Sequence, residues 1–464
     1  MSNIAFVQNR LGRTDGVSLE VDKWRRVLEE RMGHRVRYVS GNDDVPGNYV
    51  IPEIYAHHPT TWSILRNGTV AYNEDEVGNE DAFEAMLYAH ADTIEQQLMR
   101  CIEGEHLDVL IPNNLCSVGY QPAAAIALHR VMRRTGIPSI IHSHDFYYED
   151  SGEVNATCHS VASIYDRYHP PKLPNVRHVF INRIAQKELQ RRKNIHGVVV
   201  PNVFDFAQEP WRQDAYNSDL RAAFAINDDD LVFLQATRIL DRKGIESAID
   251  VIAAIDQVAS RRQALDGVRT ASGGVFRSAS SRIVLLCAGI VETIGISGDY
   301  WASLQAKAQE LGVDLRHVGE RVKHSRGSND AGEKVWSLWD TYVHADFVTY
   351  PSQWEGWGNQ FIEAVFARLP VLVFEYPVWV SDLGPVGFDV VSLGREVTGH
   401  DQRNLVTLAP SVIDRAADGV VTLLTDPARR QCAVDNNATL AEEHFSLPAL
   451  EGHIRSLFDS LGLS

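Results

Sequence analysis

The sequence predicts an α/β fold built from two doubly wound, Rossmann-like domains that face one another across a cleft. Three observations lead to this prediction. The chain has 464 residues, which exceeds one ordinary core and suits two domains of roughly 200 residues each. Short apolar runs alternate with helical patterns, as in the βαβ units of a parallel sheet. The same alternation then begins a second time in the C-terminal half.

The first half of the chain supplies the first series of strands. "NIAFVQ" at 3–8 is a short apolar run, and the stretch 11–34 that follows has helical periodicity. Four apolar residues share one face of that helix: Val17, Val21, Trp24 and Leu28. Further strands are expected at 35–40, 107–112, 137–145, 176–182 and 197–202. The long connection 43–62 is expected to help shape the cleft.

After "NVFDFAQEPWRQ" the pattern begins again, which places a domain boundary near residues 206–215. Strands are expected at 231–239, 282–290, 314–320, 345–352 and 369–377. The Ser-, Gly- and Arg-rich segment 261–282 indicates a mobile surface loop. We therefore divide the chain into an N-terminal domain (1–210), a C-terminal domain (211–440) and a final helix (441–464). For that helix, crossing back to the N-terminal domain is one arrangement.

The chain is acidic, with 44 Lys and Arg against 61 Asp and Glu and a formal net charge of −17. This charge argues against general binding to nucleic acid or anionic membranes, although two local cations can still hold one phosphate group. No apolar run approaches the ~18 residues of a membrane span, and the N-terminus lacks a signal-peptide pattern. We therefore expect a cytoplasmic protein without stable membrane insertion. The five scattered cysteines predict free thiols, and the formation of homo-oligomers stays open.

The segment "TYPSQWEGWGNQFIEAVFARLPVLVFEYP" carries the strongest chemical signal. Gly356 and Gly358 allow a close backbone turn between a predicted strand and a predicted helix. The start of that helix presents free amides, which favour anionic or hydroxyl-rich ligands. Glu355 in the turn and Glu363 one turn into the helix can then reach one ligand. The alternative is a capping glutamate beside a solvated helical one.

A second signal is "QATRILDRKG", which follows the first predicted strand of the C-terminal domain. Its place at the carboxyl end of that strand predicts that Arg238 and Lys243 clamp a diphosphate, with Gly244 opening the next helix. Two exposed cations near a helix start are the alternative. The agreement between this pair and the glutamate-containing turn favours a phosphate-bearing ligand.

Two weaker signals lie in the N-terminal domain. Asp15 and Gly16 form a turn into the first helix, whose amides can face the same phosphates. His142, His144 and Asp145 follow one another at the end of a strand. A His-x-His pair can bind a metal, but no third ligand has a recognisable spacing, so we expect no metal site and assign one histidine and Asp145 to the cleft lining.

Taken together, these motifs resemble those of the retaining glycosyltransferases of family 4, which have the GT-B fold. The resemblance rests on Glu-x7-Glu (Glu355 to Glu363), on the Arg-x4-Lys-Gly clamp and on "VPNVFD", and it covers nearly the whole chain in order. The segments "TDGVSLEVDKW" and "HSHDFYYED" are most similar to the branch that includes mannosylglucosylglycerate synthase. In two places the chain departs from the family, which often has Gly-Gly at Asp15–Gly16 and Phe at Trp357.

The resemblance implies a role for each matching residue. Arg238 and Lys243 would neutralise the diphosphate, and Glu363 would bond the ribose. The remaining donor contacts would come from Gly16, Glu355, Gly356, Trp357, Gly358 and Asn359, and the base would lie near Gly319 and Arg321. His144, Asp145 and Asn113 would form the acceptor side, in the N-terminal domain, while the C-terminal domain would bind the nucleotide sugar. The candidate catalytic residues are Glu355, His144, Arg238 and Lys243.

The resemblance implies transfer of a hexose, with retention, from GDP-mannose or UDP-glucose to a small hydroxylated acceptor such as a sugar or glucosylglycerate. The nucleotide sugar is a co-substrate, and no cofactor is required. An anionic acceptor would need cations in the N-terminal domain, where Arg10, Arg13 and Lys23 are candidates. Retention by same-face attack is favoured over a covalent Glu355 intermediate. A disaccharide phosphorylase and a non-catalytic sugar-nucleotide binder remain alternatives.

Overall fold

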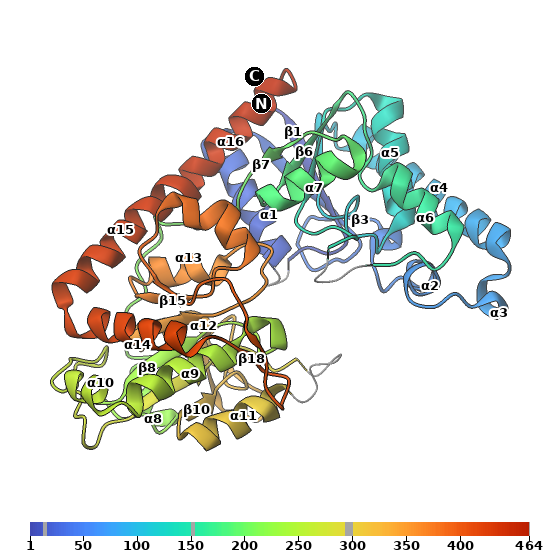
Figure 1. Ribbon diagram of the computed structural model, residues 1–464. Helices are drawn as coiled ribbons and strands as arrows, with labels where there is room; N and C mark the ends of the chain where they lie inside the picture. Colours follow the sequence, from blue (N-terminus) through green and yellow to red (C-terminus); the bar gives the residue numbers. More distant parts are fainter. Residues whose placement is uncertain (13–15, 150–153, 293–299, 464) are drawn as a thin grey trace. The chain divides into compact units, whose positions relative to one another are not determined.

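The structure is a computed structural model that describes residues 1–12, 16–149, 154–292 and 300–463. It divides into two compact units, each with its own central sheet (Figure 1). The first unit comprises Met1–Asp205 and Phe445–Ser464, and the second comprises Phe206–His444.

The first unit is a parallel sheet with helices on both faces. Its described residues form seven strands in the order β3-β2-β1-β4-β5-β6-β7. The strands are β1 Asn3–Gln8, β2 Arg35–Ser40, β3 Tyr49–Val50, β4 Val109–Pro112, β5 Ser139–Ser143, β6 Val176–Phe180 and β7 Val198–Val199. The helices are α1 Gly16–Arg26, α2 Pro59–Thr69, α3 Glu74–Val77, α4 Glu80–Gly104, α5 Pro122–Thr135, α6 His159–Tyr168, α7 Arg183–Lys193 and α16 Leu447–Ser460, with the short turns η1 Val27–Arg31 and η2 Pro52–Ile54.

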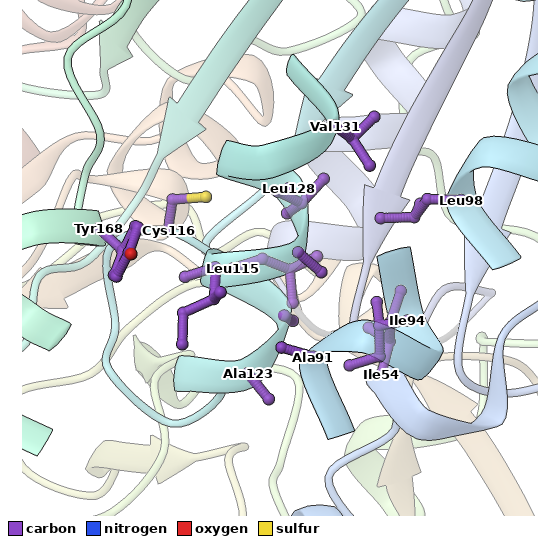
Figure 2. Close-up of a cluster of buried hydrophobic side chains, with 14 of the residues drawn as sticks. Ile54, Ala91, Ile94, Leu98, Leu115, Cys116, Ala123, Leu128, Val131 and Tyr168 are labelled. Atoms are coloured by element: carbon purple, nitrogen blue, oxygen red, sulfur yellow. The ribbon is translucent and has the colours of Figure 1, made fainter. Parts of the chain in front are cut away.

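Alternation along β1 fills two cores in this unit, because successive side chains of a strand point to opposite faces. Ala5 and Val7 join a cluster that α4 and α5 cover, and Figure 2 shows part of it, including Ile94, Leu98, Leu128 and Val131. Ile4 and Phe6 join the other cluster, which contains Trp24 of α1 and Leu450, Ile454 and Phe458 of α16. The C-terminal helix is therefore part of the core of the first unit.

The second unit repeats this plan with a shorter sheet. Its described residues form six parallel strands in the order β10-β9-β8-β14-β15-β16. The strands are β8 Leu231–Gln235, β9 Ile283–Cys287, β10 Asp314–His317, β14 Phe347–Tyr350, β15 Val371–Val373 and β16 Val391–Ser392. Together, the two sheets confirm the predicted pair of doubly wound, Rossmann-like domains.

Helices surround this second sheet, and two small sheets are added to it. The helices are α8 Leu220–Ala223, α9 Ile245–Asp256, α10 Ala259–Ala264, α11 Tyr300–Leu311, α12 Leu338–Val343, α13 Asn359–Phe366, α14 Pro410–Thr425 and α15 Pro427–Phe445, with the turns η3 Asp241–Lys243, η5 Trp379–Leu383 and η6 Gly384–Val386. The added strands are β11 Val322–Lys323, β12 Gly327–Ser328, β13 Lys334–Ser337, β17 Gly399–His400 and β18 Val406–Thr407.

The segment 261–282 differs from the mobile surface loop that its composition suggested. Leu265 and Phe276 are fully buried, and Gly274 packs closely against the backbone at Asp228. The Arg262 guanidinium lies over the Phe276 ring, 5.6 Å from its centroid. The apolar side chains therefore anchor the segment, although its Ser, Gly and Arg content is that of a loop.

Candidate functional site

The candidate site of the second unit lies at the point where the strand order reverses. From β8 the chain builds outward through β9 and β10, whereas β14 begins the other half of the sheet on the opposite side of β8. In open parallel sheets, ligands bind beyond the carboxyl ends of the strands at such a point. The two loops that leave this place, after β8 and after β14, contain Arg238 to Gly244 and Glu355 to Gly358.

The two loops are joined through their backbones. Gly244 has a φ of 58°, and a Cβ atom there would lie 2.5 Å from the Pro351 carbonyl oxygen. The Gln353 amide donates a hydrogen bond of 2.8 Å to the Arg242 carbonyl. Glycine is required at 244 because the left-handed backbone and the close approach both exclude a side chain.

An ion cluster forms where the loops meet. Lys243 Nζ pairs with Glu355 Oε1, and both side chains are largely buried, with exposed fractions of 5% and 10%. Arg242 Nη1 lies 3.3 Å from Glu355 Oε2 and donates to the Trp354 carbonyl oxygen at 2.6 Å. Burial lowers the pKa of Lys243 from its ordinary value, and the Glu355 carboxylate acts against that shift. The site therefore holds a desolvated lysine beside a carboxylate with two cationic partners.

Arg238 occupies the same loop but has a different partner. Its guanidinium pairs with Glu292, and its side chain is 52% exposed. Its positive charge still contributes, as a smaller cause, to the lowered pKa of Lys243. The two cations predicted to form one clamp thus share a loop, and Lys243 is the one that contacts Glu355.

The turn after Glu355 has no room for a larger residue at Gly358. A Cβ atom on Gly358 would lie 2.7 Å from Leu383 Cδ1 and 2.8 Å from the Tyr376 hydroxyl. That hydroxyl donates to the Trp357 carbonyl oxygen at 2.6 Å, which fixes the backbone just before α13 begins at Asn359. The half-buried Gly356 and the buried Trp357 lie in the same turn.

Glu363 lies one turn into α13 and is held from a neighbouring helix. The Tyr342 hydroxyl of α12 donates to Glu363 Oε2 at 3.0 Å. Burial, and then the nearby Glu363 charge, raise the pKa of Tyr342 well above its ordinary value, so this phenol remains a donor. Among the contacts that the structure describes, Glu355 therefore has two cationic partners, and Glu363 accepts a hydrogen bond from a neutral phenol. Glu355 and Glu363 are called the two signature glutamates below.

The first amide of α9 is used inside the protein. The Ile245 N–H donates to the Tyr300 hydroxyl at 2.9 Å, and that hydroxyl in turn donates to Glu246 Oε2 at 2.5 Å. The helix start that Gly244 opens is thus capped by a buried tyrosine and a glutamate. No sequence pattern predicts this cap, because Tyr300 lies 55 residues after Ile245.

The predicted base loop lies at the carboxyl end of β10. Gly319 is buried and packs closely against the Gly289 carbonyl, to which His317 Nε2 is also hydrogen-bonded at 2.9 Å. Arg321 Nε donates to the Lys334 carbonyl oxygen at 3.1 Å, and its guanidinium lies over the Trp336 ring. Gly319 therefore allows close packing of the loops, whereas Arg321 is tied to the small sheet.

In the first unit, the predicted acceptor-side residues gather at the carboxyl ends of β4 and β5. His144 Nε2 lies 3.4 Å from Asn113 Oδ1, and the His144 amide donates to Asn114 Oδ1 at 2.7 Å. The Asn114 amide group reaches Asp145 Oδ2 at 3.4 Å. Asn113 and His144 are buried, whereas Asp145 is exposed. The structure therefore brings Asn113, His144 and Asp145 together.

The buried His142 ring packs between the rings of Trp24 and His144. Its ring lies 4.8 Å from Trp24 and 4.2 Å from His144, centroid to centroid. Burial, with a smaller effect of His144, lowers the pKa of His142 well below its ordinary value, so the ring is neutral near pH 7. Within the described residues, no group of three or more His, Cys, Asp or Glu side chains is arranged to hold a metal ion.

The remaining predicted residues of the first unit lie around α1. Gly16 is exposed and begins this helix, while Asp15 and Arg13 lie outside the described residues. Lys23, offered as a cation for an anionic acceptor, is used within the unit, because its ammonium group pairs with Glu20 at 2.9 Å and donates to the Val203 carbonyl. None of the described helices has the length and apolar character needed to cross a membrane.

Known proteins resemble the chain over nearly its full length. It is 36% identical to mannosylglucosylglycerate synthase of Petrotoga mobilis over 91% of the chain and 94% of that protein. It is 34% identical to mannosylglucosylglycerate synthase of Thermotoga maritima over 97% of both chains. No protein-family model matches.

Solved structures match the fold at low sequence identity. A glycosyltransferase of Rickettsia africae has a TM-score of 0.59 at 12% identity, covering 100% of this chain and 99% of that one. Sucrose-phosphate synthase of Thermosynechococcus elongatus has a TM-score of 0.58 at 14% identity, with the same coverage. Anabaena HepE in complex with UDP has a TM-score of 0.55 at 13% identity, covering 99% of this chain and 100% of that one. These matches confirm the GT-B architecture.

Proposed function

This chain belongs to the mannosylglucosylglycerate synthase family of GT-B glycosyltransferases, and from that premise we propose that it transfers a mannosyl group from a nucleotide sugar to glucosylglycerate. The reaction releases a nucleoside diphosphate and retains the anomeric configuration. GDP-mannose is the donor that we propose, with UDP-glucose as the alternative. The first unit supplies the acceptor side, and the second binds the donor.

The cluster of Lys243, Arg242 and Glu355 is the observation that supports this function most directly. Cleavage of the anomeric bond leaves new negative charge on the diphosphate, and a cation in a dry site stabilises that charge more than one in water. Lys243 is such a cation, since it is buried and lies at the switch point of the sheet. Arg238 reinforces it from the same loop.

In this proposal, the two signature glutamates bind the donor sugar and the ribose. Glu355 accepts hydrogen bonds from the sugar hydroxyls, together with the amides of Trp357, Gly358 and Asn359. Glu363 accepts from the ribose, with the Tyr342 hydroxyl keeping its carboxylate in place. The base lies against the loop of Gly319 and Arg321.

Retention follows from same-face attack in this proposal. Glu355 is engaged by two cationic side chains, which suits a carboxylate that accepts hydrogen bonds and does not suit a free nucleophile. The departing diphosphate then accepts the proton of the acceptor hydroxyl as the new bond forms. His144, oriented by Asn113 and Asn114, positions the transferred sugar from the acceptor side.

The test is direct. The chain is incubated with glucosylglycerate and, separately, GDP-mannose, UDP-glucose or GDP-glucose, and the products are analysed by mass spectrometry and NMR. We expect a hexosyl-glucosylglycerate with an α-anomeric signal from GDP-mannose, and none from a Glu355→Gln control. Cleavage of a disaccharide by inorganic phosphate, without any nucleotide, would favour a phosphorylase. Tight binding of nucleotide sugars with no turnover would favour a non-catalytic binder.

A further inference from the structure

Arg242 is absent from the sequence-predicted site, yet it contacts three successive residues of the loop after β14. Its carbonyl accepts from the Gln353 amide at 2.8 Å. Its Nη1 donates to the Trp354 carbonyl oxygen at 2.6 Å and lies 3.3 Å from Glu355 Oε2. The side chain is 28% exposed, so the guanidinium works at the border of the buried cluster.

The Glu355 carboxylate is divided between two cations. Oε1 pairs with Lys243, and Oε2 faces Arg242. The two cations are adjacent in the η3 turn, so they approach the carboxylate from one short element. One of them can therefore leave the carboxylate without removing its only charged partner.

We propose that Arg242 is a positioning residue that keeps Glu355 in place while Lys243 moves its contact to the diphosphate of the donor. The inference rests on the proposed function, because it assumes a diphosphate ligand at Lys243. Oε1 of Glu355 then becomes available to a sugar hydroxyl, while Oε2 stays attached to Arg242. The contact with the Trp354 carbonyl orients the guanidinium for this task.

Arginine suits this role better than lysine would. The planar guanidinium presents five N–H donors in a fixed fork, so it can serve a carbonyl and a carboxylate together, whereas an ammonium group is a point charge. A buried carboxylate that loses its partners is strongly disfavoured. Without Arg242, Glu355 would follow Lys243 or compete with the diphosphate for it.

The kinetic test compares Arg242→Gln and Arg242→Lys with the wild-type chain, using GDP-mannose and glucosylglycerate. We expect kcat to fall about tenfold or more in Arg242→Gln, as for the loss of one hydrogen bond to a charged group, with the donor KM changed by less than about threefold. Arg242→Lys should recover part of kcat. Arg368→Gln, which removes an exposed arginine paired with Asp435, should match the wild type. An unchanged kcat in Arg242→Gln, or a loss confined to the donor KM, would overturn the inference.

A structural readout does not depend on transfer. Crystals of the wild-type and Arg242→Gln chains are soaked with GDP and, separately, with UDP. We expect Lys243 to face the diphosphate in the wild type while Glu355 stays on Arg242, and Glu355 to be displaced in the variant. A Glu355 that keeps Lys243 and leaves Arg242 would overturn the positioning role but not the proposed function. If the expected positions of Lys243 and Glu355 were observed but no hexose were transferred to glucosylglycerate, the proposed function would be overturned and the positioning role supported. Absence of diphosphate binding would overturn both.

Discussion

Lys243 is the residue on which the proposed donor chemistry depends most. Its replacement by Ala removes a buried cation from the departing diphosphate and leaves Glu355 with Arg242 as its charged partner. We expect kcat/KM for nucleotide-sugar transfer to fall by about 10²-fold or more, comparable to the loss of one preorganised electrostatic contact. Initial rates of nucleoside diphosphate release measure this. Lys187→Ala removes an exposed lysine from α7 and should leave the rate unchanged; equal effects of the two substitutions would contradict the role of Lys243.

Substitution of Tyr342 tests the role of Glu363. Tyr342→Phe keeps the buried ring and deletes the hydroxyl that donates to Glu363. Because Glu363 is proposed to bond the ribose, the nucleoside diphosphate should bind about tenfold more weakly, which is the usual size of one hydrogen bond to a charged group. Isothermal titration calorimetry with GDP and UDP gives the dissociation constants. An unchanged affinity for both nucleotides would contradict the proposed contact between Glu363, as held by Tyr342, and the ribose.

Some residues of the candidate site could be predicted from the sequence, and Arg242 could not. Glu355, Glu363 and Lys243 belong to patterns with fixed spacing, so the sequence identified them as candidates before any contact was known. Arg242 belongs to no such pattern, and its direction is set by the η3 turn and by a hydrogen bond from Gln353, more than a hundred residues later. A contact of this kind depends on the tertiary structure and leaves no local signal.

Gly244 allows the loop after β8 to approach the loop after β14 closely. Gly244→Ala combines a positive φ of 58° with a Cβ position 2.5 Å from the Pro351 carbonyl oxygen. Gly312→Ala is a matched control, because Gly312 has a φ of +67° and no atom within 4 Å of its Cβ position. We expect Gly312→Ala to cost about 1 kcal/mol of stability, from the left-handed backbone alone, and Gly244→Ala to cost more and to reduce transfer. Chemical denaturation measures both changes, and equal costs would show that the approach to Pro351 is relaxed without penalty.

The elements that the sequence predicted well are those with strong periodicity. The runs at 3–8, 231–239 and 345–352 contain β1, β8 and β14, and "NQFIEAVFARL" contains α13 with Phe361 and Val365 buried. The strands β11 to β13 gave no such signal, because two- to four-residue strands do not define an apolar alternation. Composition was also misleading for 261–282, where a few buried side chains outweigh many polar ones.

At the scale of the whole molecule, each unit has its own sheet and core, and the chain enters the first unit twice. The sequence predicted two domains because the strand pattern begins a second time, but it could not decide where the last helix packs. Its apolar face has no preferred partner in the sequence itself. The structure supplies that partner in the cluster of β1 and α1, where Leu450 and Ile454 are fully buried.

Stability of the first unit should therefore depend on residues near the end of the chain. Ile454→Ala removes a fully buried side chain from the cluster that holds Ile4 and Phe6, and should destabilise the first unit by about 2–5 kcal/mol, as large-to-small core substitutions do. Leu424→Ala in α14 is the matched substitution in the second unit. Hydrogen exchange distinguishes the effects of the two substitutions. Amides of β1 should lose protection in Ile454→Ala, and amides of β8 should lose protection in Leu424→Ala. If Ile454→Ala left β1 protected and exposed β8 instead, α16 would owe its stability to the second unit.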